Sequence, residues 1–156
     1  MSVEKVYDYF KKFNMENRIL QFDKSSATVE LAAKAVGCEP AKIAKSLTFA
    51  VDNMPIMIVT AGDAKIDNSK FKAFFQTKAK MLSAKEVESL IGHSVGGVCP
   101  FAINDNVQVF LDVSLKRFAT VFPAAGSSNS AIELHINELE RHSNFSTWVD
   151  VCKGWN

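Results

Sequence analysis

The sequence predicts an α/β fold: a single domain with a mixed, barrel-like β-sheet and surrounding helices. The chain has 156 residues, about the length of one domain, and 47% of them are hydrophobic. Strand-like segments outnumber the connecting helices, and several follow one another through short turns, which favours a mixed sheet over a doubly wound parallel one. No repeat, low-complexity tract or linker rich in Pro, Gly or Ser divides the chain. We therefore expect one domain over residues 1–156.

The N-terminal part is predicted to contain two helices with a short strand between them. Apolar residues at helical spacing indicate an amphipathic helix over 3–13, and residues 18–23 have the pattern of a short strand. Thr28 is a suitable N-cap for a helix that runs to Val36, and Gly37 suits the C-terminal end of this helix.

Two consecutive strands form the predicted centre of the sheet. They are IAKSLTFAV at 43–51 and MPIMIVTA at 54–61, and a turn at Asp52-Asn53 joins them. The second strand is apolar almost throughout, which indicates that both of its faces are covered.

The second half of the chain continues the alternation of helices and strands. A helix is expected over 68–76, and another over 83–91 opens with a capping box of Ser83 and Glu86. The Gly-rich loop that follows leads to strands at 107–112, 118–122 and 131–135, a helix at 137–142 and a last strand at 147–152.

The charge balance excludes binding along a nucleic-acid duplex. The chain carries 18 Lys and Arg against 17 Asp and Glu, and this formal net charge of +1 provides no broad basic surface for a phosphate backbone. We expect no DNA-binding role. The first 80 residues nevertheless hold 13 basic and 9 acidic side chains, so a small basic footprint can still meet a few phosphates.

The cysteines and the hydropathy pattern indicate a soluble, cytoplasmic protein. Cys38, Cys99 and Cys152 are odd in number and far apart, as is typical of reduced thiols. The N-terminus has no apolar signal core, and no apolar run approaches the ~20 residues that a membrane span needs. We therefore expect no membrane association.

Lys45 is the most informative single residue. On the strand at 43–51 it shares one face with Ile43, Leu47 and Phe49. A desolvated ammonium is costly unless it is paired with an anion or deprotonated, so a lysine on an apolar face indicates a binding site. Two other interpretations stay open: the segment ends a helix, or the side chain extends to solvent at a strand end.

Three further segments offer backbone or hydroxyl groups to a ligand. GHSVGGVCPF at 92–101 forms a loop whose backbone N–H groups can point at a developing oxyanion, although a simple turn is the plainer interpretation. FPAAGSSNS at 122–130 can line a pocket for a small polar ligand or make an ordinary hairpin loop. Residues 25–28 place hydroxyls at a helix N-terminus, where they hold an anion or cap the helix.

His93 and Cys99 suggest a thiol nucleophile and its base. No third orienting residue is evident, and a cysteine before a proline is more often a small packed residue, which is the interpretation we favour. The His and Cys residues also lack the compact spacing of metal ligands. We expect no metal and no other cofactor.

These segments together resemble the YbaK-type family, the editing domains associated with prolyl-tRNA synthetase that act as aminoacyl-tRNA deacylases. The resemblance covers most of the chain from about residue 18, and no synthetase domain accompanies it, so the chain is similar to a free-standing, trans-acting member. The matching stretches are TVELAAKAVGCEPAKIAKSLTF at 28–49, MPIMIVTAGD after it, GHSVGGVCPF at 92–101 and VFPAAGSSNSAIEL at 121–134.

The resemblance implies hydrolysis of the ester that joins a wrong amino acid to the 3′-terminal adenosine of a tRNA, with tRNA-Pro carrying Cys or Ala as the expected substrate. A synthetase pocket for proline cannot strongly reject smaller amino acids, because a methylene difference is worth only ~1–3 kcal/mol. The implied partners are the acceptor end of mischarged tRNA and prolyl-tRNA synthetase. The alternatives are a non-catalytic module that binds tRNA or a synthetase through the same pocket, and a Cys99-dependent hydrolase.

The resemblance also implies the site residues. Lys45 is similar to the family's pocket lysine, and Gly96 and Gly97 match a backbone cradle that positions the scissile carbonyl and a water. Family members use no protein nucleophile or metal, so catalysis is expected from positioning and electrostatics, helped by the substrate's own hydroxyl or thiol. The implied substrate-binding residues are Thr28, Val98, Cys99, Pro100, Gly126, Ser127 and Ser128.

Overall fold

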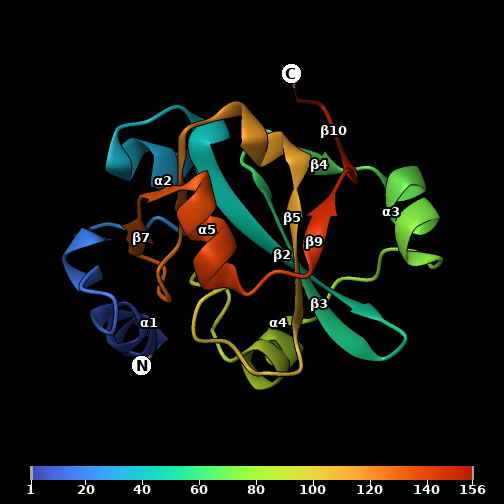
Figure 1. Ribbon diagram of the computed structural model, residues 1–156, viewed down its shortest axis with the longest axis horizontal. Coiled ribbons are helices and arrows are strands. Elements are labelled where there is room, and N and C mark those ends of the chain that lie inside the picture. Colours follow the sequence, from blue (N-terminus) through green and yellow to red (C-terminus); the bar gives the residue numbers. More distant parts are fainter. Residues whose placement is uncertain (1, 156) are drawn as a thin grey trace.

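The computed structural model describes residues 2–155, and this part of the chain forms a mixed α/β domain around a six-stranded sheet (Figure 1). The strand order is β8-β6-β2-β3-β5-β9, and the sheet curls into a half barrel, as the sequence predicts. The strands are β2 (Ile43–Val51), β3 (Met54–Ala61), β5 (Gln108–Asp112), β6 (Thr120–Pro123), β8 (Leu134–His135) and β9 (Thr147–Val149).

The hairpin of β2 and β3 lies at the centre of this sheet. The two strands pair antiparallel from Ala44 opposite Ala61 to Val51 opposite Met54. Asp52 and Asn53 form the turn with φ angles of 52° and 64°, a conformation that matches the twist of a two-residue hairpin. All of β3 after its first residue is buried, which confirms that both of its faces are covered.

Parallel neighbours flank the hairpin on each side. The start of β2 pairs with β6, where Ile43 lies opposite Phe122, and β3 pairs with β5 over four positions. Because β3 and β5 run in the same direction, their ends at Ala61 and Asp112 lie at the same edge of the sheet. The chain segments that follow these two strands are therefore neighbours.

The helices begin and end close to the predicted positions. Thr28 Oγ1 accepts a hydrogen bond from the Leu31 N–H at 3.2 Å, and Gly37 ends that helix in a left-handed conformation. Ser83 and Glu86 form the predicted capping box. The helices are α1 (Ser2–Lys11), α2 (Val29–Val36), α3 (Asn68–Phe75), α4 (Ala84–Glu86) with a π-helical turn at Val87–Ile91, and α5 (Ile136–Ser143).

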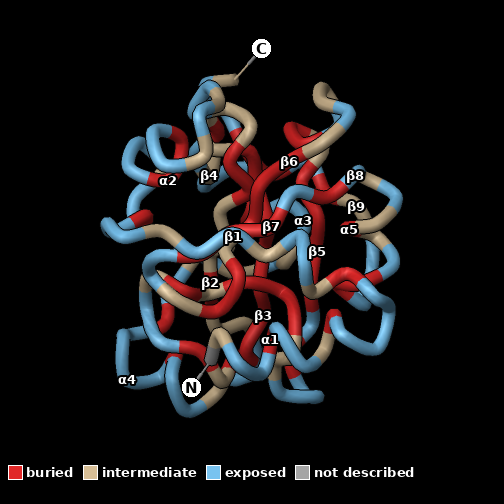
Figure 2. Tube along the Cα trace, turned by 90° about the vertical axis from the view of Figure 1, so that its left-hand side faces the viewer, coloured by how far each residue is buried: buried red, intermediate tan, exposed pale blue. Residues whose placement is uncertain are grey.

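Most buried side chains belong to one apolar cluster that runs along the central strands (Figure 2). Ala32, Ala33, Ile43 and Phe122 form a second, smaller cluster between α2 and the start of β2. This cluster places α2 against the sheet. Within residues 2–155 no helix has the length and apolar character needed to cross a membrane.

The predicted strand at 131–135 is wrong as a single element. It divides into β7 (Ser130–Ile132), which pairs with β1 (Ile19–Gln21), and β8, which pairs with β6. All three residues of β7 are buried, and in β8 Leu134 is buried while His135 is exposed, so both short parts carry residues that suit a strand. The pattern therefore does not reveal that the chain changes sheets.

The predicted strand at 147–152 divides as well. β9 ends at Val149, and β10 (Cys152–Lys153) pairs with β4 (Lys65–Ile66), a two-residue strand that the sequence did not predict. Between β9 and β10 the Val151 N–H donates to the buried Asp112 carboxylate at 3.0 Å. This hydrogen bond takes the place of a sheet contact.

Candidate functional site

A cavity of about 490 Å³ opens between β2, the start of α2, the loop at 92–101 and the chain between β6 and β7. Apolar side chains make most of its wall, and Lys45 is the sole ionisable residue among the described residues that line it. Residues with hydroxyl groups also line the cavity, between the apolar side chains: Ser26, Thr28, Ser46, Thr48 and Ser130. The lining suits a small ligand with one anionic or strongly polar group.

Lys45 lies on β2, so the interpretation that this segment ends a helix is wrong. Its side chain is half-buried, and Nζ donates to the Gly62 carbonyl oxygen at 3.4 Å. Burial lowers the pKa of this ammonium, while Cys152 and Asp63 oppose the shift. Among the described residues no carboxylate oxygen lies within 4.0 Å of Nζ. The group is thus a partly desolvated cation that still has room for an anion or an ester carbonyl.

The backbone at Gly62, whose carbonyl oxygen accepts the hydrogen bond from Lys45, passes very close to a neighbouring segment. A Cβ on Gly62 would collide with the Pro40 carbonyl oxygen and would lie 2.8 Å from Val29 Cγ1. The close approach brings the end of β3 against the start of α2. The carbonyl that faces Lys45 is thereby fixed in place.

One hydrogen bond closes the loop at 92–101 across its base, and a second joins this base to Lys5 of α1. His93 Nε2 donates to the Phe101 carbonyl oxygen at 2.7 Å, and Lys5 Nζ donates to the Gly92 carbonyl oxygen at 2.7 Å. At the tip, Gly96 has a φ of +98° and lines the cavity together with Val98. The loop thus presents its backbone at the cavity wall.

Cys99 and His93 are neighbours, but they do not form a nucleophile and base. Cys99 Sγ lies 3.6 Å from His93 Nε2, and both side chains are buried. The Nε2 atom carries its hydrogen toward the Phe101 carbonyl, which can only accept, so Nε2 has no lone pair for the thiol. Burial also raises the pKa of Cys99 to about 12. The geometry fits a packed structural thiol.

The two predicted loops meet through direct backbone contact at Gly97. A Cβ at this position would lie 2.5 Å from the Ser127 nitrogen and 2.6 Å from the Gly126 carbonyl carbon. Real Cβ atoms do not approach backbone this closely, so only glycine fits. Gly97 therefore joins the loop at 92–101 to the one at 122–130.

The loop at 122–130 is tied in turn to the segment before α2. The Ser26 N–H and hydroxyl both donate to the Ser128 carbonyl oxygen, at 2.6 and 3.2 Å. Phe22 and Asn129 exchange two further hydrogen bonds at 2.8 and 2.9 Å. These contacts place Ser26 and the N-terminal end of α2 at the cavity.

The structure divides the residues that the sequence singled out into two groups. Thr28, Lys45, Gly96 and Val98 line the cavity. The others support it from behind or beside it: Gly97, Cys99, Pro100, Gly126, Ser127 and Ser128. Within the described chain no cluster of three or more His, Cys, Asp or Glu side chains is arranged to hold a metal ion.

One wall of the cavity escaped the sequence analysis. Met81, Leu82, Ala84 and Val87 line it, and Met81 bridges to Phe49 of β2. Met81 stands between Lys80 and Leu82 in an irregular connection, where no periodicity marks it. Its 61% exposure at the cavity mouth is evident only in three dimensions.

Comparison with known proteins agrees with this arrangement. Residues 23–142 match the family model described as an aminoacyl-tRNA editing domain. A candidate trans-editing enzyme for prolyl tRNA synthetase has the same fold, with a TM-score of 0.87, 24% identity and 98% of each chain covered.

Three relatives show how widely the sequence is shared. The uncharacterized protein YwhH of Bacillus subtilis is 53% identical over 99% of both chains. EbsC of Enterococcus faecalis, named as a candidate Cys-tRNA(Pro)/Cys-tRNA(Cys) deacylase, is 28% identical over 69% of this chain and 66% of its own. The proline–tRNA ligase of Bacillus licheniformis is 26% identical over 81% of this chain, which spans only 22% of the ligase.

Gly97→Ala is expected to lower the free energy of unfolding by about 2–3 kcal/mol, because the added methyl forces the two loops apart. Gly37→Ala is the matched control: it has open space but a φ of +80°, so we expect a loss of about 1 kcal/mol. Denaturant unfolding of both variants measures the difference. A loss for Gly97→Ala no greater than that of the control would contradict the contact.

Lys45→Met is expected to raise the melting temperature by about 1–3 °C at neutral pH, because it removes a partly desolvated charge. The unfolded chain binds the Lys45 proton more tightly than the folded one, so the parent gains stability as pH rises through the lowered folded pKa. The advantage of the variant should therefore shrink as pH approaches 10.5, the ordinary lysine value. Thermal unfolding of Lys45→Met and of the exposed control Lys72→Met tests this, and equal behaviour of the two would count against it.

Proposed function

Because this chain belongs to the aminoacyl-tRNA editing domain family, we propose that it is a trans-acting deacylase that hydrolyses the ester of mischarged tRNA. The observation that carries the proposal is a largely apolar cavity with Lys45 as its ionisable group, at the convergence of three segments distant in sequence. The proposed domain extends over residues 1–156. The proposed partners are the acceptor end of tRNA in the cytoplasm and prolyl-tRNA synthetase.

The proposed substrate is tRNA-Pro carrying Cys or Ala. The name of the EbsC relative refers to Cys-tRNA(Pro), and the ligase relative acts on proline and its tRNA. The part of the cavity near Val29, Ala32 and Phe122 is apolar, which suits a small uncharged aminoacyl side chain. A second site of this kind removes errors that a proline pocket cannot reject by binding alone.

In the proposed mechanism Lys45 contacts the substrate directly. Its ammonium binds the phosphate of the terminal nucleotide or the carbonyl oxygen of the ester, where low polarity strengthens the attraction. The backbone at Gly96, which lines the cavity, positions the scissile carbonyl. Gly97, whose N–H donates to the Ser94 carbonyl oxygen at 3.1 Å, keeps this part of the loop in place. Thr28 and Val98 form part of the surrounding wall. The wall is supported from outside by Cys99, Pro100, Gly126, Ser127 and Ser128.

The reaction itself is a hydrolysis. A water oxygen attacks the carbonyl carbon, the bond to the ribose oxygen breaks, and the products are a free amino acid and a tRNA with its 3′-terminal hydroxyl restored. The ribose hydroxyl of the substrate, or the thiol of a cysteinyl group, helps to orient or accept the proton of this water. Such positioning accounts for catalysis without a protein nucleophile.

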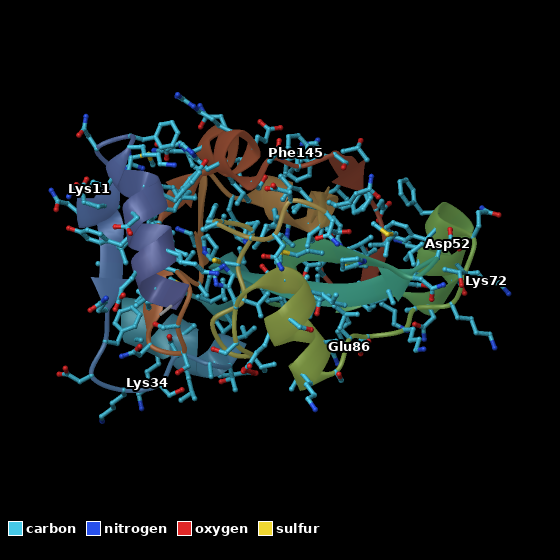
Figure 3. The ribbon with its side chains drawn as sticks, turned by 90° about the horizontal axis from the view of Figure 1, so that it is seen from below. Lys11, Lys34, Asp52, Lys72, Glu86 and Phe145 are labelled. Carbon is cyan, nitrogen blue, oxygen red and sulfur yellow. The ribbon has the colours of Figure 1, made fainter. Side chains whose placement is uncertain are left out.

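Lys45→Ala is expected to reduce deacylation of Cys-tRNA-Pro or Ala-tRNA-Pro by at least about 100-fold, because the cation that binds the substrate is lost. Lys72→Ala is the control, since Lys72 is exposed on α3 and does not line the cavity. Figure 3 shows it at the end of the molecule opposite Lys34 of α2. The assay follows ester hydrolysis on a panel of tRNAs charged with different amino acids. Binding of these tRNAs without hydrolysis by the parent would instead favour a non-catalytic module, and full activity of Lys45→Ala would refute the role of Lys45.

Cys99→Ala is expected to keep deacylation within about threefold of the parent, because a buried thiol whose pKa is raised to about 12 supplies no thiolate. Hydrolysis is measured on the same charged tRNAs after circular dichroism has shown that the variant is folded. Complete loss of activity in a folded Cys99→Ala protein would support the Cys99-dependent hydrolase.

A further inference from the structure

The carbonyl that Lys45 contacts belongs to Gly62, in the segment that follows β3. This segment is held by a 3₁₀ helix, η4 (Val113–Arg117), which follows β5 directly. The segment comes after β3, and the ends of these parallel strands share one edge of the sheet. There Ser114 Oγ accepts a hydrogen bond from the Ala61 N–H at 3.1 Å. Gly62, whose carbonyl faces Lys45, is the next residue.

Arg117 at the end of η4 holds the other side of Gly62. Its two terminal nitrogens donate to the two carboxylate oxygens of Asp63, at 2.6 and 2.9 Å. Its Nε donates to the Ser114 carbonyl oxygen at 2.9 Å. The guanidinium carbon also lies 4.9 Å from the ring centroid of Phe118 and 4.9 Å from that of Trp155. Arg117 is therefore oriented on several sides.

Asp63 is a natural competitor for the Lys45 ammonium. It is adjacent to the Gly62 carbonyl that Lys45 contacts, and each of the two charges shifts the pKa of the other. A carboxylate with no other partner would be drawn to a half-buried cation in this surrounding. In the structure both Asp63 oxygens face Arg117 instead, and the pKa of Asp63 is lowered chiefly by that hydrogen bond.

We propose that Arg117 is a positioning residue that keeps Lys45 available to the substrate, because it occupies both oxygens of Asp63 and so prevents an ion pair between Asp63 and Lys45. The proposal rests on the function proposed for Lys45. It gives the bidentate pair a purpose beyond stability: the fork of a guanidinium holds both oxygens at once, which a lysine at the same position would not do.

Three variants test the role of Arg117 in deacylation: Arg117→Ala, Asp63→Asn and the double variant. Arg117→Ala frees the Asp63 carboxylate to pair with Lys45 in place of the substrate. We therefore expect kcat/KM to fall about tenfold. Asp63→Asn and the double variant should stay within about threefold of the parent, because neither retains a carboxylate that can pair with Lys45. Removal of Asp63 thus rescues the loss of Arg117.

A purely structural role predicts a different order. Asp63→Asn breaks the same pair as Arg117→Ala, so it would then cause a similar loss, and the double variant would show no rescue. Either result would overturn the proposal. Circular dichroism and thermal unfolding of all three variants show whether each is folded at the assay temperature.

Amine labelling tests the role of Arg117 independently of deacylase activity. Acetic anhydride modifies uncharged, accessible amines, and mass spectrometry compares labelling at Lys45 with that at the exposed Lys72. Arg117→Ala should lower Lys45 labelling about threefold or more through ion pairing with Asp63, and the double variant should restore it. A parent without deacylase activity leaves this measurement intact, whereas equal labelling of parent and Arg117→Ala would refute the role of Arg117.

Discussion

The antiparallel pairing of β2 with β3 is the constraint on which the site depends. It places Lys45 opposite Thr60, two residues before the reversal at Gly62, so the lysine reaches the carbonyl at the end of the neighbouring strand. The same hairpin carries the parallel partners β6 and β5 on its two sides. One of them leads into the loop at 122–130 and the other into η4. A register shift by one residue would turn Lys45 to the other face of the sheet and remove the site.

The central elements could be predicted from the sequence because local signals and burial agree there. The strand at 43–51, the turn at Asp52-Asn53 and the capped helix from Val29 to Val36 each combine a turn or cap residue with a matching hydrophobic pattern. The short strands at 130–135 and 147–153 lack such agreement. Their partners lie far away in sequence, and two or three alternating residues fit either sheet equally well. Pairing there is decided by long-range contacts, among them the bond from Val151 to Asp112.

The candidate site was predictable in its parts but not in its assembly. A lysine among apolar strand residues and two loops of small residues stand out in the sequence, yet their convergence depends on the backbone contact at Gly97. The neighbourhood of His93 and Cys99 was suggested by the sequence, whereas the hydrogen bond from Nε2 to Phe101 that removes the base was not. Met81 could not be predicted at all, because it reaches the cavity from an irregular segment that carries no pattern.

The electrostatics of the site depend on one cation, the Lys45 ammonium, whose hydrogen-bond partner is a neutral carbonyl. A lysine in contact with a carboxylate would be stable but neutralised, and a lysine free in water would bind an anion weakly because solvent screens the charge. Lys45 lies between these limits, half-buried, with a neutral carbonyl as its hydrogen-bond partner. The nearest acidic side chain on the following turn, Asp63, is engaged by Arg117. The folded chain therefore loses some stability at Lys45 and retains an attraction that a substrate anion or ester carbonyl can use.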